Sequence, residues 1–142
     1  MKRPIGALIA ALALLIGATV YLSHRAPEGI DRRHSGAAGV LRGAIGGQEV
    51  LLTLTPWPPV AMREVDVAVS LPGYAGKESP YVDLSMEGME MGRNRVDLSR
   101  GADGRFHGTG VSVRCPSGRH DWVATVTAPG AGKAVFHFAV AD

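Results

Sequence analysis

The chain contains a single cysteine, and aromatic side chains make up only 6% of its 142 residues. One cysteine excludes an internal disulfide. The formal net charge is only +2 and the basic residues are dispersed, so the sequence lacks the electrostatic footprint of a nucleic-acid-binding protein. A CxxC pair, a phosphate-binding loop and a Gly-x-Ser-x-Gly nucleophile turn are also missing. We therefore expect a protein that is not an enzyme and binds no nucleic acid.

One long apolar run is present, and it lies near the N-terminus. Lys2 and Arg3 precede an apolar stretch over residues 5–22, which as a helix would span about 27 Å, close to the roughly 30 Å thickness of a bilayer core. The basic start indicates that this end stays in the cytoplasm. We expect residues 1–24 to be a signal anchor that crosses a membrane once, with the C-terminal part outside the cytoplasm. A cleaved signal peptide is the alternative, and both interpretations imply export.

The rest of the chain divides into two parts. Residues 25–44 are rich in Gly, Ala and charge without a lasting apolar period, which is typical of a flexible tether, and an anionic lipid surface is its expected neighbour. Residues 45–142 form the predicted exported domain, where short runs alternate between apolar and polar residues and are separated by Pro and Gly turn signals. The predicted strands cover residues 49–55, 65–71, 81–84, 93–98, 105–113, 122–126 and 134–140.

This pattern predicts an all-β fold, an immunoglobulin-like β-sandwich of about seven strands, preceded by one N-terminal transmembrane helix. Trp122, Ala124 and Val126 alternate with other residues and are expected to share one inward face. No helix is expected after residue 25.

Three of the five methionines lie within residues 86–92, Met-Glu-Gly-Met-Glu-Met-Gly. Core methionines are usually scattered, whereas these alternate with Glu and Gly in a segment that is polar for a core. Thioether sulfur favours a soft cation such as Cu(I) and binds it without losing a proton. In an extended segment Met89 and Met91 would share one face about 6.7 Å apart, and Met86 would face the opposite way. The alternative is that all three cover an apolar patch or part of the core.

Cys115 is the natural further ligand, because thiolate and thioether together make a soft site. The alternative for Cys115 is a small buried side chain. His107 and His120 are further candidates, although neither has a partner at a spacing diagnostic of a metal site. The predicted ligands of a Cu(I) ion are Met86, Met89, Met91, Cys115 and His107.

Two motifs resemble those of the FixH and YtkA-like families, over roughly residues 45–140. The first is Met-Glu-Met-Gly-Arg-Asn-Arg-Val at residues 89–96, and the second is Cys-x-x-Gly-Arg-x-Asp-Trp at residues 115–122, with Gly-Arg-Phe-His-Gly between them. The resemblance implies a bacterial cell-envelope protein that crosses the inner membrane once, with residues 45–142 as a periplasmic domain. It also implies a link to copper handling and to assembly of haem-copper respiratory oxidases. Carried onto this chain, the motifs fall on Met86, Met89 and Met91 and on Cys115, Gly118, Arg119, Asp121 and Trp122.

Three functions are compatible with these features. In the first, the protein is a Cu(I)-binding accessory or chaperone-like protein that passes copper to a copper-requiring oxidase or another copper carrier. Alternatively, it is a metal-independent accessory subunit whose methionines dock on a respiratory or cation-transport membrane complex. A thiol-redox centre at Cys115 is the third, and the lack of a resolving cysteine disfavours it.

Overall fold

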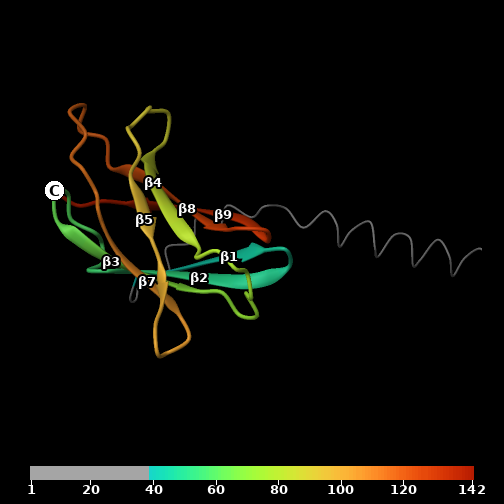
Figure 1. Ribbon diagram of the computed structural model, residues 1–142. Helices are drawn as coiled ribbons and strands as arrows, with labels where there is room; N and C mark the ends of the chain where they lie inside the picture. The colour runs from blue at the N-terminus through green and yellow to red at the C-terminus, as the bar shows by residue number, and fades with distance from the viewer. Residues whose placement is uncertain (1–38) are drawn as a thin grey trace, which may run out of the picture.

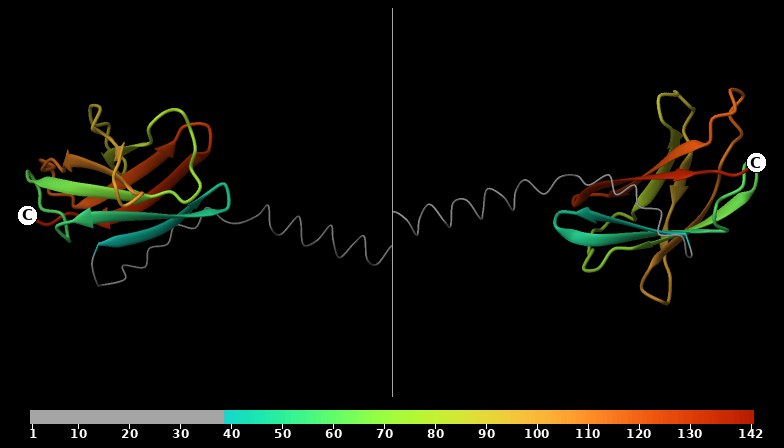
Figure 2. Two further views of the ribbon diagram at one scale, coloured as in Figure 1. Left: turned by 60° about the horizontal axis from the view of Figure 1, so that its bottom comes forward. Right: turned by 180° about the vertical axis from the view of Figure 1, so that it is seen from behind.

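The computed structural model describes residues 39–142, which form two antiparallel β-sheets stacked as a sandwich (Figures 1 and 2). The prediction of an all-β sandwich is confirmed. Residues 39–142 include no helix with the length and apolar character needed to cross a membrane. The predicted transmembrane segment, residues 1–24, and the predicted tether up to residue 38 lie outside the described residues.

Each sheet has a defined strand order. The five-stranded sheet consists, in spatial order, of β1 (Val40–Ile45), β2 (Gln48–Thr55), β3 (Glu64–Ser70), β7 (Phe106–Val111) and β6 (Ser99–Arg100). The four-stranded sheet consists of β5 (Arg95–Asp97), β4 (Tyr81–Met86), β8 (Asp121–Ala128) and β9 (Gly132–Ala139). Only the buried Leu98 separates β5 from β6, so the chain crosses from one sheet to the other at this residue.

All seven predicted strands are present, and β1 and β6 are additional. All of β1 except Ile45 lies within residues 25–44, the range predicted as a tether, so the sandwich begins earlier in the chain than predicted. Gly43 hides the alternation of this strand, because it interrupts an inward face that includes Leu41 and Ile45. A Cβ atom at Gly43 would lie 2.9 Å from the ring of Phe136 on the other sheet. The missing side chain therefore lets the two sheets approach each other.

Apolar side chains from both sheets fill the space between them. Alternate residues of β3 and β8 are buried, as expected for strands with one face on a core. Trp122 is 1% exposed, and its ring lies 6.5 Å from that of Phe138. The prediction that Trp122, Ala124 and Val126 face inward is confirmed.

Two loops far apart in the sequence lie at the same end of the sandwich. β4 and β8 are antiparallel neighbours, and Met86 at the end of β4 pairs with Trp122 near the start of β8. The loop that follows β4, residues 87–94, therefore lies beside the loop that precedes β8, residues 112–120 (yellow and orange at the top of Figure 1). Both Figure 1 and the rear view in Figure 2 show these loops side by side. The methionine segment is thereby brought to the cysteine.

Candidate functional site

A contact between two sulfur atoms forms the centre of the candidate site. The thiol of Cys115 points at the thioether of Met89, with 4.0 Å between Sγ and Sδ. Cys115 is 5% exposed, while Met89 is partly buried and packs against the core. Cys115 was expected to join the methionine segment in one site, and Met89 is the methionine that it contacts.

A tight turn holds the Cys115 thiol. The N–H of Gly118 donates to the carbonyl oxygen of Cys115 at 3.0 Å, with Pro116 as the second residue of the turn. Pro at the second position and Gly at the fourth are the residues that such β-turns favour. The turn places the hydroxyl of Ser117 2.9 Å from the Cys115 sulfur. The sequence prediction missed Ser117, and the signal that could have found it is the Pro116 and Gly118 turn, which brings the hydroxyl to the sulfur.

The environment of Cys115 favours its ionised form. The hydrogen bond from the Ser117 hydroxyl lowers the thiol pKa most strongly, and burial opposes this effect. Backbone N–H groups of Ser117 and Arg119 and the positive charge of Arg119 lower the pKa further, and the net result is a pKa below the ordinary value for cysteine. Because the thiolate is the metal-binding form, this turn prepares the sulfur to bind a cation.

Met86 occupies a different position from the other two methionines. β4 extends to Met86, two residues beyond the predicted end of the strand, and the alternation that buries Val82 and Leu84 also buries Met86 at 3% exposure. Its pairing with Trp122 places it in the core of the sandwich. Met86 is thus a core side chain rather than one presented to solvent, despite the polar residues that follow it.

The loop after Met86 turns back instead of continuing as an extended strand. The N–H of Met89 donates to the carbonyl oxygen of Met86 at 3.3 Å, and Gly88 between them has a φ of 71°. A Cβ atom at Gly88 would lie 3.8 Å from Nη1 of Arg119, so the cysteine loop reaches over this turn. Met91 remains partly buried against the same core cluster. Met89 and Met91 are therefore the partly exposed methionines of this segment, and Met89 is the one with a contact to Cys115.

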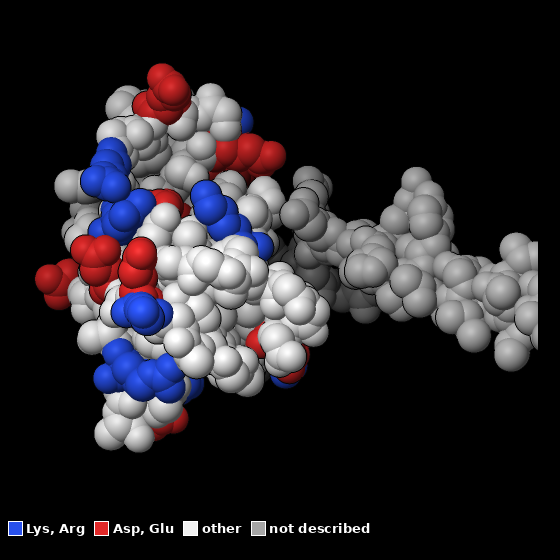
Figure 3. Space-filling view, turned by 45° about the vertical axis from the view of Figure 1, so that its right-hand side comes forward, with Lys and Arg blue, Asp and Glu red and all other residues white. Residues whose placement is uncertain are grey.

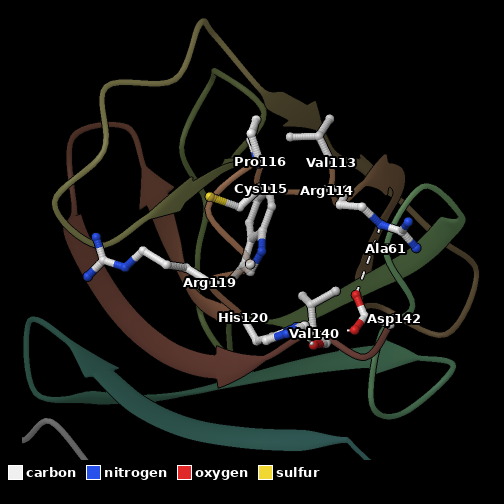
Figure 4. A pocket seen from close by; sticks show the side chains of 11 residues that line it. Ala61, Val113, Arg114, Cys115, Pro116, Arg119, His120, Val140 and Asp142 are labelled. Carbon is white, nitrogen blue, oxygen red and sulfur yellow. Dashed lines mark hydrogen bonds and ion pairs between the residues drawn. The ribbon is translucent and has the colours of Figure 1, made fainter.

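Cys115 lines a hollow of about 460 Å³ together with Arg119 and His120, and Met89 is not part of this lining (Figure 4). In Figure 4, Cys115 and Arg119 lie on one side of the hollow, whereas Arg114 and Asp142 lie on the other. Asp142 contacts Arg114 at 4.0 Å and Nε2 of His120 at 3.8 Å. Nδ1 of His120 lies 3.0 Å from the carbonyl oxygen of Val140. Nδ1 of His120 is therefore occupied by a backbone carbonyl, whereas Nε2 faces the exposed Asp142 carboxylate beyond hydrogen-bond distance.

His107 lies away from the sulfur atoms. It occupies the start of β7, where it pairs with Ser99 of β6, and the adjoining turn at residues 101–105 projects from the end of the sandwich opposite the methionine loop (Figure 1). Nε2 of His107 lies 2.9 Å from Oδ1 of Asp103 in this turn. This hydrogen bond holds the pKa of the Asp103 carboxyl well below its usual range, and a second hydrogen bond from Arg105 adds to the effect. We therefore remove His107 from the proposed ligand set.

The donors at the site fit a soft cation. Two sulfur atoms that share one metal ion can be at most about 4.6 Å apart, twice a typical metal–thiolate bond of about 2.3 Å, and Cys115 and Met89 satisfy this limit. Within residues 39–142, no group of three or more His, Cys, Asp and Glu side chains could hold a metal ion. A hard divalent ion would need such oxygen and nitrogen donors, whereas Cu(I) binds thiolate and thioether.

The face of the molecule drawn in Figure 3 carries charges of both signs. Figure 3 shows Lys and Arg side chains interspersed with Asp and Glu over one face of the molecule. No protein-family model, curated protein sequence or solved structure matches the chain.

Proposed function

We propose that this protein is a membrane-anchored, periplasmic Cu(I)-binding accessory protein that serves the assembly of a copper-requiring respiratory oxidase. Its N-terminal apolar run anchors it in the bacterial inner membrane, and its sandwich belongs to the immunoglobulin-like class, as the resemblance to FixH and YtkA-like proteins implies. Copper is the cargo of this protein, which it passes to an oxidase or to another copper carrier.

The contact between Cys115 and Met89 carries this proposal. The two sulfur atoms come from loops that adjoin different strands and lie 4.0 Å apart, and Cys115 also lines an open hollow. Of the five ligands predicted from sequence, the proposal keeps Cys115, Met89 and Met91. Met86 belongs to the core, and His107 interacts with Asp103 elsewhere.

The chemistry of the pair suits a site that takes up and releases its cargo. When Cu(I) binds, the Cys115 thiol loses its proton to water and a copper–sulfur bond forms, and Ser117 favours this ionisation. Met89 contributes a neutral thioether, which binds Cu(I) more weakly than a thiolate and needs no proton transfer. A carrier's sulfur ligands can therefore replace Met89 first and Cys115 second, so that copper is never released to solvent.

X-ray absorption at the copper edge tests this proposal in the full chain, purified in detergent and loaded anaerobically with Cu(I). We expect a first shell made of sulfur atoms, and loss of one sulfur contribution in the Met89→Leu variant. The matched control is His107→Gln, which should leave the spectrum unchanged. A shell dominated by nitrogen or oxygen would reject the sulfur site.

A second function is supported by the packing of the methionines. Met86 is buried, and Met89 and Met91 pack against the core with part of their surface exposed, as side chains of an apolar docking surface would. The protein would then be a metal-independent accessory subunit of a respiratory or cation-transport complex. Co-purification from membranes separates the two functions, because a structural subunit stays with its complex when copper is chelated.

A further inference from the structure

Arg119 carries an exposed and unmatched positive charge in the loop that holds Cys115. Within residues 39–142 its guanidinium forms no ion pair, although Glu87 and Glu90 belong to the neighbouring methionine loop. The other arginine that lines the hollow, Arg114, differs because it contacts the carboxylate of Asp142 at 4.0 Å. Arg119 is therefore the guanidinium of this hollow that is available to an incoming anion.

The guanidinium of Arg119 lies where the cysteine loop meets the methionine loop. Its Nη1 atom lies 3.8 Å from the position that a Cβ atom of Gly88 would occupy. Gly88 directly precedes Met89, whose Sδ atom lies 4.0 Å from Sγ of Cys115. In Figure 4, Arg119 and Cys115 lie on the same side of the hollow. The charge is thus placed beside the sulfur pair, and its field reaches the thiol, whose pKa it lowers.

We propose that Arg119 recognises a copper carrier that holds Cu(I) between two thiolates, and that it stabilises the intermediate in which this carrier and Cys115 share the ion. The inference rests on the proposed function and names the kind of partner that the site accepts. Cu(I) bound by two thiolates carries a net negative charge, and the thiolate of Cys115 adds another when it joins them. A guanidinium beside the shared ion offsets this charge.

The transfer exchanges one sulfur ligand at a time. A bond forms between copper and Sγ of Cys115 while the bond to one carrier thiolate breaks, and the thiol proton of Cys115 passes to the released carrier sulfur. The second carrier thiolate then leaves as Sδ of Met89 binds, and it takes a proton from water. Copper remains Cu(I) throughout. A cationic copper complex with neutral ligands develops no excess negative charge in this exchange, so Arg119 does not favour it.

The test compares two copper donors of opposite charge, with the full chain in detergent under anaerobic conditions. The anionic donor is a synthetic peptide whose Cys-x-x-Cys site holds Cu(I), and the cationic donor is the Cu(I)–thiourea complex, which has neutral sulfur ligands. Copper that remains with the chain after rapid gel filtration at successive times gives the uptake rate. We expect Arg119→Gln to take copper from the peptide about fivefold more slowly than the wild type, and from thiourea at the wild-type rate.

Two further variants are matched controls. Arg119→Lys keeps the positive charge and should take copper from the peptide at nearly the wild-type rate. Arg114→Gln removes the same charge from the other side of the hollow and should also behave like the wild type. Slow uptake by Arg119→Lys would show that the charge is not the cause, and slow uptake by Arg114→Gln would assign the effect to the charge of the whole hollow. Either result overturns the inference.

The two donors separate the remaining explanations. Uptake from the peptide by Arg119→Gln at the wild-type rate would reject the role of Arg119. Equal slowing with both donors would show that Arg119 acts through the pKa of Cys115 and not through the charge of the carrier, which also overturns the inference. If the wild type takes copper from neither donor, the proposed function itself fails. Normal copper binding by the wild type with an unaffected Arg119→Gln variant rejects the inference alone.

Discussion

The sulfur atoms of Cys115 and Met89 lie 4.0 Å apart although 26 residues separate them in the chain. Strand pairing explains this contact, because Met86 and Trp122 are opposite each other on β4 and β8. The loop after one strand and the loop before the other therefore meet at one end of the sandwich. The two soft donors thus lie in loops that adjoin neighbouring strands.

Replacing Ser117 with Ala should raise the pKa of the Cys115 thiol, because the hydroxyl 2.9 Å from the sulfur is the largest cause of its lowered value. The folded variant would hold less thiolate at a given pH below that pKa, so alkylation of Cys115 by iodoacetamide would need a higher pH. The rate of alkylation as a function of pH measures this shift. Ser117→Thr keeps a hydroxyl and should retain the wild-type profile; equal profiles for Ala and wild type would contradict the account.

Met86 and Met91 should differ in their contribution to stability. Met86 is 3% exposed in the core, so Met86→Ala should lower the free energy of unfolding by about 3 kcal/mol, whereas Met91→Ala at the partly exposed position should cost about 1 kcal/mol. Met86→Leu conserves volume and should cost less than about 1.5 kcal/mol. Urea unfolding of the full chain measures all three. Similar losses for the two alanine variants would contradict the placement of Met86.

The Asp103 carboxyl should make the stability depend on acid pH. His107 and Arg105 lower the pKa of Asp103 in the folded state, so the ionised form stabilises the fold above the ordinary carboxyl pKa of about 3.9, and this contribution is lost as the pH falls below that value. Asp103→Asn should therefore be less stable than wild type at pH 7, with a difference that shrinks in acid.

Thermal unfolding between pH 3 and pH 7 measures the difference between Asp103→Asn and the wild type. The matched control is Asp97→Asn, because Asp97 is exposed and has no side-chain ion pair within the described part of the chain. The same pH profile for both variants would contradict a specific role for Asp103. Because Asp103 is a surface residue, water and salt reduce the size of the effect.

Much of the fold was predictable, because the alternation of apolar residues is a local property of a strand. Trp122, Ala124 and Val126 share the inward face that their spacing predicts. β1 was not predicted, because Gly43 has no side chain and so interrupts the alternation of apolar residues. The ring of Phe136 on the other sheet lies too close to Gly43 to leave room for a side chain. A contact between the two sheets cannot be recognised from a single strand.

The site was predictable only in part. The alternation of Val82, Leu84 and Met86 was a local signal that Met86 belongs to the core, and the polar residues after it obscured this signal. The contact between Cys115 and Met89 depends on which strands are neighbours, and the period of two does not determine strand order. Residue chemistry thus indicated the sulfur donors, while topology decided which of them meet.

The central claim is that Cys115 and Met89 hold Cu(I) together, and a competitive Cu(I) titration tests it most directly. The full chain should be titrated anaerobically in detergent against a coloured chelator, because a chain that begins at residue 45 would lose most of β1. We predict one tightly bound equivalent in the wild type and in His107→Gln, affinity at least about tenfold weaker in Met89→Leu, equal to about 1.4 kcal/mol, and no tight binding in Cys115→Ser. Equally tight binding by Cys115→Ser, or no binding by the wild type, would contradict the account.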